Sequence, residues 1–108
     1  FEEQKTLPNF ITQKKIIKDV VSVKDQAKTN YKGKIVMIPS ADPGYDWLFA
    51  HNISGLITKY GGANSHMAIR CAELNLPAAI GVGEDLYNNI KNNSKIILNC
   101  LNETIINV

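Results

Sequence analysis

Short apolar runs that alternate with helix-forming segments constrain the fold of this chain most strongly. Helix-forming segments at 43–50, 65–74 and 84–91 lie between successive apolar runs. The runs are rich in Ile and Val, as buried strands are. They cover residues 14–23, 34–38, 55–58, 78–82, 95–99 and 104–108. Strands that alternate with helices predict a compact α/β domain with a largely parallel sheet.

The boundaries of these elements carry signals of their own. Pro39 should end the strand before it, because proline cannot donate to a sheet ladder. Asp42 can cap a helix in which Pro43 takes the first position. The helix over 65–74 is rich in Ala and is the strongest of the three. We expect its buried face to be apolar: Ala68, Ile69, Ala72 and Leu74.

The beginning of the chain differs in composition from the rest. Residues 1–13 are polar and interrupted by Pro8, which favours an N-terminal arm or linker. The domain itself is then expected to occupy residues 14–108. A chain of 108 residues with 44% apolar content is long enough for one domain with a modest core.

Charge and cysteine content exclude several classes of protein. The net charge of +2 comes from scattered lysines and gives no argument for nucleic acid or an anionic membrane as partner. Unbroken apolar runs of about three or four residues cannot span a bilayer. Cys71 and Cys100 are too few for a disulfide framework, so we expect reduced thiols in a cytoplasmic protein.

A glycine turn followed closely by a histidine is the most informative local feature. Gly61 and Gly62 follow a buried strand and let the main chain approach a ligand closely. Asn64 or Ser65 can cap the next helix, whose free N–H groups attract anions such as phosphate. His66 would then lie in the first helical turn, where a phosphate group is favoured.

The chemistry of imidazole suits this position. Its reference pKa of about 6.5 leaves much of the ring neutral and nucleophilic near neutral pH. A helix N-terminus would stabilise a dianionic phosphoryl group on His66, which fits a covalent phosphohistidine intermediate. Arg70 shares a helix face with His66 and can reach back toward the phosphate. These residues alone do not distinguish a catalytic histidine from a surface or capping one.

A longer pattern around His66 resembles a known family. It reads Gly61-Gly62-x-x-Ser65-His66-x-Ala68-Ile69, then Glu73-Leu74-x-x-Pro77-Ala78 and Gly81. This pattern is similar to the mobile phosphohistidine domain of the PEP-utilising enzymes, which include PEP synthase, pyruvate phosphate dikinase and enzyme I of the sugar phosphotransferase system. The resemblance covers about residues 33–108 and implies a swivelling β/β/α domain. In the enzymes of that family, the matching histidine accepts phosphate from ATP or PEP in one domain and delivers it in another.

Carried over by position, the resemblance implies that His66 is the phosphorylated residue. The common arginine of the family, six residues after the histidine, is Ala72 here, and we expect Arg70 to do a related job. Asp42 and Tyr45 are expected either to face the acceptor or to be structural. The residues expected to bind or support the phosphate are Thr58, Gly61, Gly62, Asn64, Ser65 and Arg70.

Residues 38–47 and 57–70 look closer to one branch, the PEP synthase-like kinases of capsule and surface-polysaccharide biosynthesis, which include L-glutamine kinase. The resemblance implies an ATP-grasp domain and an acceptor-binding domain in the same polypeptide, with a small-molecule acceptor. ATP and Mg²⁺ would bind mainly in that partner domain, so this domain should be inactive in isolation.

Two alternatives stay open. One is a phosphocarrier in a PEP-dependent sugar phosphotransferase system, and the other is a non-catalytic interaction module of the same fold. We expect no metal site in this chain. The spacing of the four residues that could bind zinc matches no short-loop zinc pattern: His51, His66, Cys71 and Cys100.

Overall fold

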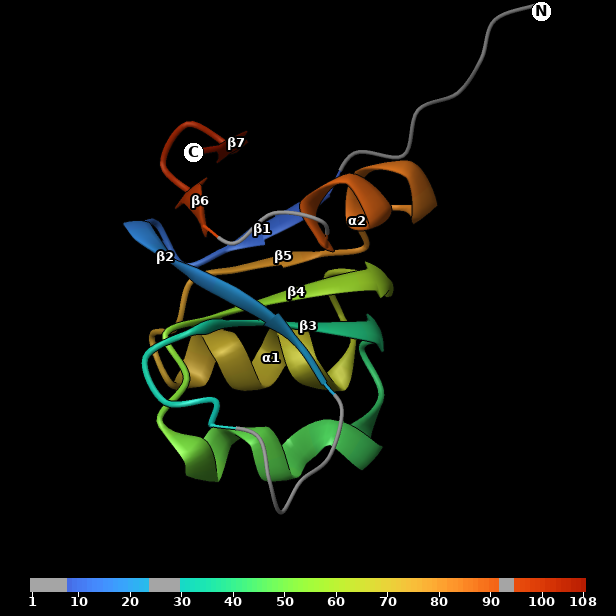
Figure 1. Cartoon of the computed structure of the whole chain (residues 1–108). Helices are drawn as coiled ribbons and strands as arrows, with labels where there is room; N and C mark the ends of the chain where they lie inside the picture. The colour runs from blue at the N-terminus through green and yellow to red at the C-terminus, as the bar shows by residue number, and fades with distance from the viewer. Residues whose placement is uncertain (1–7, 24–29, 92–94) are drawn as a thin grey trace, which may run out of the picture.

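The computed structural model describes residues 8–23, 30–91 and 95–108. In these residues seven strands form one sheet in the order β1-β5-β4-β3-β2-β6-β7 (Figure 1). The elements are β1 (Asn9–Ile11), β2 (Lys15–Ser22), β3 (Ile35–Ser40), the 3-10 helix η1 (Pro43–His51), β4 (Gly55–Tyr60), α1 (His66–Glu73), β5 (Ala78–Ile80), α2 (Glu84–Lys91), β6 (Lys95–Asn99) and β7 (Thr104–Asn107). None of the described helices is long and apolar enough to cross a bilayer.

The sheet is parallel only at its centre. β2, β3, β4 and β5 run parallel to one another, and η1 and α1 provide the crossovers into β4 and β5. β1, β6 and β7 pair in antiparallel fashion. The prediction of a largely parallel sheet is therefore correct for the centre and wrong for the edges. The helices η1 and α1 connect the parallel pairs β3–β4 and β4–β5, whereas a short turn joins β6 to β7 and makes that pair antiparallel.

Strand β2 belongs to both halves of the curled sheet. Its first half, Lys15–Asp19, pairs with β6, and its second half, Val20–Ser22, pairs with β3. The sheet therefore turns back over its own face, and β6 and β7 form a second layer with α2 (Figure 1). The helices η1 and α1 cover the opposite face. This arrangement confirms the predicted β/β/α fold.

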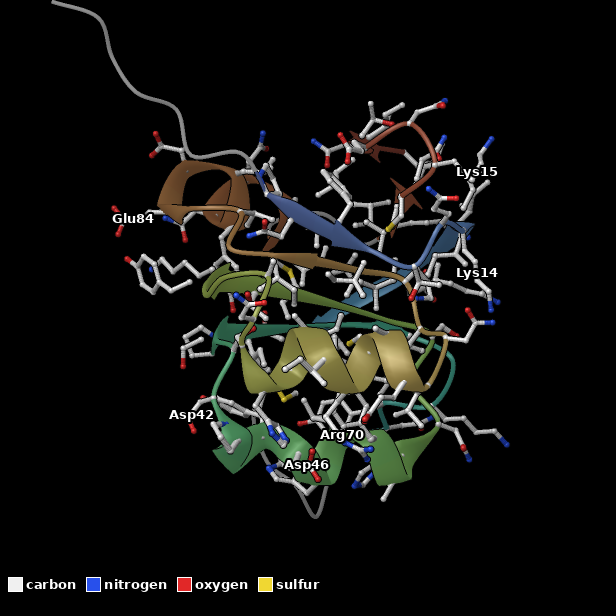
Figure 2. All side chains as sticks on the ribbon, turned by 180° about the vertical axis from the view of Figure 1, so that it is seen from behind. Lys14, Lys15, Asp42, Asp46, Arg70 and Glu84 are labelled. Carbon is white, nitrogen blue, oxygen red and sulfur yellow. The ribbon has the colours of Figure 1, made fainter. Side chains whose placement is uncertain are left out.

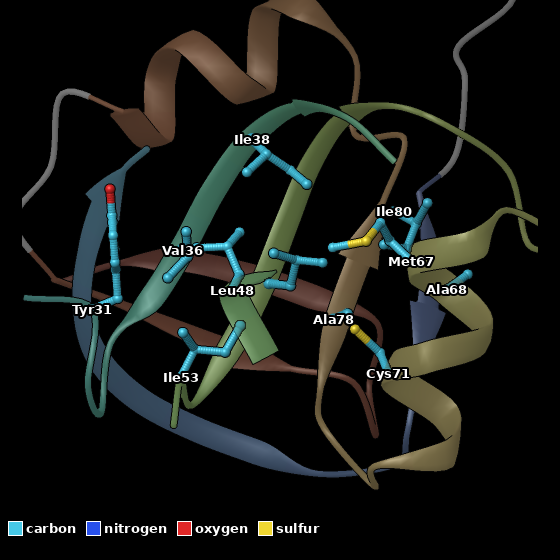
Figure 3. Close-up of a cluster of buried hydrophobic side chains, with 11 residues drawn as sticks. Tyr31, Val36, Ile38, Leu48, Ile53, Met67, Ala68, Cys71, Ala78 and Ile80 are labelled. Atoms are coloured by element: carbon cyan, nitrogen blue, oxygen red, sulfur yellow. The ribbon is translucent and has the colours of Figure 1, made fainter. Parts of the chain in front are cut away.

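Two hydrophobic cores lie on the two faces of the central strands. Side chains alternate along β3, so Val36 and Ile38 point to one core and Ile35 and Met37 to the other. The core beneath α1 and η1 is shown in Figure 3 and comprises Tyr31, Val36, Ile38, Leu48, Ile53, Leu56, Met67, Ala68, Cys71, Ala78 and Ile80. Each large side chain buried there stabilises the fold by about 1.5–3 kcal/mol. This packing holds α1, and with it His66, in place.

The buried face of α1 differs from the predicted one. Only Ala68 of the four expected residues is buried, and it packs with Met67 and Cys71. The other three are exposed: Ile69, Ala72 and Leu74. Two neighbouring stripes of this helix are apolar enough to be buried, and periodicity alone does not choose between them. Burying Met67 removes more apolar surface from water than burying Ala72 does.

We expected Pro39 to end β3, but the strand continues past it to Ser40. The pairing between β2 and β3 reaches only Met37, so within the described residues Pro39 has a paired strand on one side only. A proline is tolerated at such an edge because fewer ladder hydrogen bonds depend on its missing N–H.

The expected N-terminal arm contains a strand. Residues Asn9–Ile11 form β1 and pair with Ala78–Ile80 of β5. This pairing depends on the free edge of β5, which lies far away in the sequence and leaves no mark on the local composition. Residues 1–7 of the expected arm lie outside the described residues.

Candidate functional site

The carboxyl ends of β3, β4 and β5 meet at one edge of the sheet, and the glycine turn lies there. The loop from Gly61 to Ser65 leaves β4 at this edge and leads directly into α1. Gly61 has φ +137°, and a Cβ atom on it would lie 2.6 Å from the Cβ of Ala41. Gly81 has φ +76°, and a Cβ atom on it would lie 2.3 Å from the carbonyl oxygen of Gly61. These two glycines therefore allow three chain segments to pack together.

Thr58 supports the same edge from inside the core. Its side chain is fully buried. The hydroxyl group donates to the carbonyl oxygen of Tyr60 at 2.9 Å and accepts from the N–H of Gly81 at 2.9 Å. The Thr58 hydroxyl group therefore joins the backbone at the end of β4 to the backbone just after β5.

Ser65 is the N-cap of α1. Its Oγ atom accepts from the backbone N–H of Ala68 at 3.4 Å and donates to the carbonyl oxygen of Gly62 at 2.7 Å. One hydroxyl group therefore joins the glycine turn to the helix and determines where the first helical residue, His66, begins. Gly62 and Asn64 are exposed at the surface of this loop.

Replacing Ser65 with Ala should lower the free energy of unfolding by about 1 kcal/mol, because both hydrogen bonds of the hydroxyl group are lost. Ser65→Thr keeps a hydroxyl group at the cap and should lose clearly less. Urea denaturation of the three proteins measures the difference. Equal stability of the Ala variant and the unsubstituted chain would show that this cap does not support α1.

The His66 ring is accessible. Its side chain is 39% exposed, and Nε2 lies 2.8 Å from Oδ1 of Asp46 on η1. Because a carboxylate oxygen only accepts hydrogen bonds, Nε2 carries the hydrogen in this contact. A ring buried in the core would have excluded reaction with any donor, and His66 is not buried in this way.

Arg70 converges on the same carboxylate oxygen. Its Nε lies 3.2 Å from Oδ1 of Asp46, between α1 and η1 (Figure 2). The hydrogen bond from His66, and then the bond and charge of Arg70, lower the pKa of Asp46 below its ordinary value. Asp46 therefore stays ionised through the neutral range. The guanidinium group also lies 3.4 Å from Glu73 and 5.3 Å from the centre of the Phe49 ring. The expected shared face of His66 and Arg70 is confirmed by their common contact.

Asp46 is the residue of this cluster that the sequence did not indicate. It lies within residues 38–47, twenty residues before His66, and nothing in that segment marks it as a partner of the histidine. Asp42 instead caps η1 by accepting from the N–H of Gly44 at 2.8 Å. Tyr45 packs against the core beneath α1. The structure thus gives Asp42 and Tyr45 structural contacts and places a third η1 residue beside the histidine.

The cysteines take no part in this cluster. Cys71 and Cys100 are both buried and free, as expected. Burial raises the pKa of the Cys71 thiol to about 12, so this thiol is protonated and unreactive at neutral pH. Among the residues that the structure describes, no group of three or more His, Cys, Asp and Glu side chains could hold a metal ion.

Fold and site together define a small β/β/α domain that presents one accessible histidine where a glycine turn meets a helix. Residues 30–103 match the sequence profile of the PEP-utilising enzyme, mobile domain. The chain belongs to this family.

Relatives of known function are much longer than this chain. It is 33% identical over 69 residues to the phosphoenolpyruvate synthase of Aeropyrum pernix, which covers 63% of this chain and 8% of that protein. It is 30% identical over 97 residues to the phosphoenolpyruvate-protein phosphotransferase of Buchnera aphidicola, covering 85% of this chain and 16% of that protein. A UPF0107 protein solved by NMR has the same fold, with a TM-score of 0.70 at 14% identity over 97% of this chain and 99% of that one.

Proposed function

We propose that this chain is the phosphohistidine carrier domain of a multidomain, ATP-dependent phosphotransferase. His66 would accept a phosphoryl group derived from ATP and pass it to a small-molecule acceptor. The observation that carries the proposal is the accessible His66 ring at the first residue of α1, with Arg70 beside it. Membership of the PEP-utilising mobile-domain family supports the same role.

The chemistry that His66 would supply is nucleophilic. A ring nitrogen with a free lone pair attacks phosphorus, an N–P bond forms, and a P–O bond of the donor breaks with its electron pair on the leaving oxygen. Transfer to the acceptor reverses the roles, with the ring as leaving group. Arg70 would hold the phosphoryl oxygens by charge-assisted hydrogen bonds, and the N-terminus of α1 would stabilise their charge.

Other domains of the same polypeptide would supply the rest. The chain spans 8% and 16% of the two relatives described above, which supports further domains in the parent protein. We propose an ATP-grasp domain that binds ATP and Mg²⁺, and an acceptor-binding domain, between which this domain swings. The 108 residues alone should then show no steady-state kinase turnover.

Within this class we propose the PEP synthase-like kinases, with L-glutamine kinase of capsule biosynthesis as the nearest branch. The resemblance of residues 38–47 and 57–70 to that branch supports ATP as donor, and the likeness to a phosphoenolpyruvate synthase supports a small-molecule acceptor. A cytoplasmic location is part of the proposal. The reduced thiols of Cys71 and Cys100 support it.

A second function is favoured by one observation. Of the two curated relatives described above, the one that covers 85% of this chain is a phosphoenolpyruvate-protein phosphotransferase. A carrier in a PEP-dependent sugar phosphotransferase system would take its phosphoryl group from PEP and pass it to a protein. The third hypothesis is an interaction module without catalysis, in which His66 would stay unmodified.

Incubating the parent polypeptide with ATP labelled in the β position, or with labelled PEP, separates these functions. We expect label from ATP on His66 that is labile in acid and stable in base. Label from PEP alone would support the transport carrier, and no label from either donor would favour the interaction module. The 108-residue chain with ATP and Mg²⁺ serves as control, and turnover by it would contradict the proposed division between domains.

A further inference from the structure

One carboxylate oxygen, Oδ1 of Asp46, is shared by two groups that would also bind a phosphoryl group. It lies 2.8 Å from Nε2 of His66 and 3.2 Å from Nε of Arg70. The two partners come from α1 and the carboxylate from η1, so tertiary packing alone brings the three together. Asp46 is 46% exposed and Arg70 34% exposed, and all three side chains can therefore move without disrupting the core.

The contact with Asp46 determines which ring nitrogen is protonated in the unphosphorylated domain. Because Nε2 donates its hydrogen to the carboxylate, the lone pair of the neutral ring lies on Nδ1. Nε2, which shares the Asp46 oxygen with Arg70, is thus protonated and unreactive while Asp46 holds it. Attack through Nε2 requires that this hydrogen bond is released first.

The same oxygen marks an anion position. It lies between Nε2 of His66 and the guanidinium group of Arg70. A phosphoryl group that replaces the hydrogen on Nε2 would therefore have its oxygens within reach of the Arg70 guanidinium group. The carboxylate and the phosphoryl group therefore compete for one place. They also repel each other, because both carry negative charge.

We propose that Asp46 is a positioning residue that competes with the phosphoryl group for the place beside Nε2 of His66. In the unphosphorylated domain its carboxylate holds the ring and Arg70. When Nε2 is phosphorylated, the carboxylate leaves and Arg70 pairs with the phosphoryl oxygens. This inference rests on the proposed function and deepens it. Asp46 would keep the phosphohistidine less stable, so that the phosphoryl group is passed on readily.

Phosphoramidate tests this on the 108-residue chain itself, without a donor domain. Through solvent, the proton on Nε2 is exchanged for one on Nδ1. The Nε2 lone pair then attacks phosphorus, an N–P bond forms, and the P–N bond of phosphoramidate breaks with its electron pair on the departing ammonia. At a fixed ratio of phosphoramidate to ammonia, the ratio of phosphorylated to unphosphorylated His66 reports their relative stability.

Asp46→Asn keeps the shape of the side chain and removes its charge. We expect it to raise the phosphorylated-to-unphosphorylated ratio of His66 about tenfold, since repulsion at a partly exposed site is screened but not abolished. Arg70→Gln should lower the ratio about threefold, because it removes the cation that pairs with the phosphoryl group. Asp85→Asn makes the same charge change at an exposed position on α2 and should leave the ratio unaltered.

Nitrogen and phosphorus NMR give a readout that a purely structural role would not move. The unsubstituted chain should show His66 as the Nε2–H tautomer before phosphorylation and an N–P bond at Nε2 afterwards. In Asp46→Asn the preference for that tautomer should weaken, because a neutral amide oxygen is a poorer acceptor than a carboxylate.

An unchanged ratio in Asp46→Asn, an equal rise in Asp85→Asn, or phosphorylation at Nδ1 would each overturn the inference. Lack of phosphorylation of His66 in every variant also contradicts it, because Nε2 must be reachable once Asp46 moves. The proposed function fails separately, if neither ATP nor PEP labels the parent polypeptide. In that case the phosphoramidate ratio still measures whether Asp46 competes.

Discussion

Replacing His66 with Asn should abolish phosphorylation of the parent polypeptide, with a fall in transfer rate of more than about a thousandfold. The lone pair of an amide nitrogen is delocalised into its carbonyl group and does not attack phosphorus, whereas that of neutral imidazole does. The His66 side chain is 39% exposed, so the substitution leaves both cores intact. Intact-protein mass spectrometry measures the phosphoryl group, and a thermal melt verifies the fold.

The second histidine of the chain provides the matched control. His51 lies at the end of η1, where its ring packs edge-on against Trp47 at 5.4 Å and Tyr31 at 5.6 Å. His51→Asn removes an imidazole of the same kind away from the Asp46 cluster, and label on the polypeptide should persist. Full activity of His66→Asn, or loss of label only in His51→Asn, would show that the catalytic residue is wrongly assigned.

Replacing Gly81 with Ala should destabilise the chain by about 3–5 kcal/mol, which combines a strained backbone with overpacking. Gly81 is buried with φ +76°, and its new Cβ atom would lie 2.3 Å from the Gly61 carbonyl oxygen. The obstacle is backbone, so a rotamer change cannot relieve it. Urea denaturation measures the loss, and the Tm should fall by roughly 10–20 °C.

Gly62→Ala is the control for this substitution. A Cβ atom on Gly62 meets nothing within 4 Å, and its φ lies outside the left-handed region. This variant should stay within about 0.5 kcal/mol of the unsubstituted chain. If Gly81→Ala were as stable as Gly62→Ala, the close approach of the segments after β4 and β5 would not exist in solution.

The bounds of helices and strands that depend on neighbouring residues could be predicted closely from the sequence. Helix α2 has the predicted bounds, and β6 begins and ends where its apolar run does. The cap of η1 by Asp42 follows from residues that are adjacent in the chain. The start of α1 follows in the same way from Ser65, because a cap acts on backbone groups only three residues away.

Predictions failed where contacts with a segment far away in the sequence determine the local structure. The strand β1 depends on the free edge of β5, and Pro39 is tolerated because β2 ends its pairing at Met37. The rotation of α1, which buries Met67 and exposes Ile69, depends on the sheet beneath it. Each choice is made by packing and pairing that bring together residues far apart in the sequence.

By itself, the sequence determined the alternation of strands and helices, the glycine turn, and a histidine at a helix start, because propensity, capping and backbone freedom act over a few residues. Only the tertiary structure decided what surrounds that histidine. Asp46 reaches His66 and Arg70 because η1 packs against α1 on the same face of the sheet. A contact between side chains twenty residues apart depends on how the intervening strand and loop place two helices, and no local pattern records that geometry.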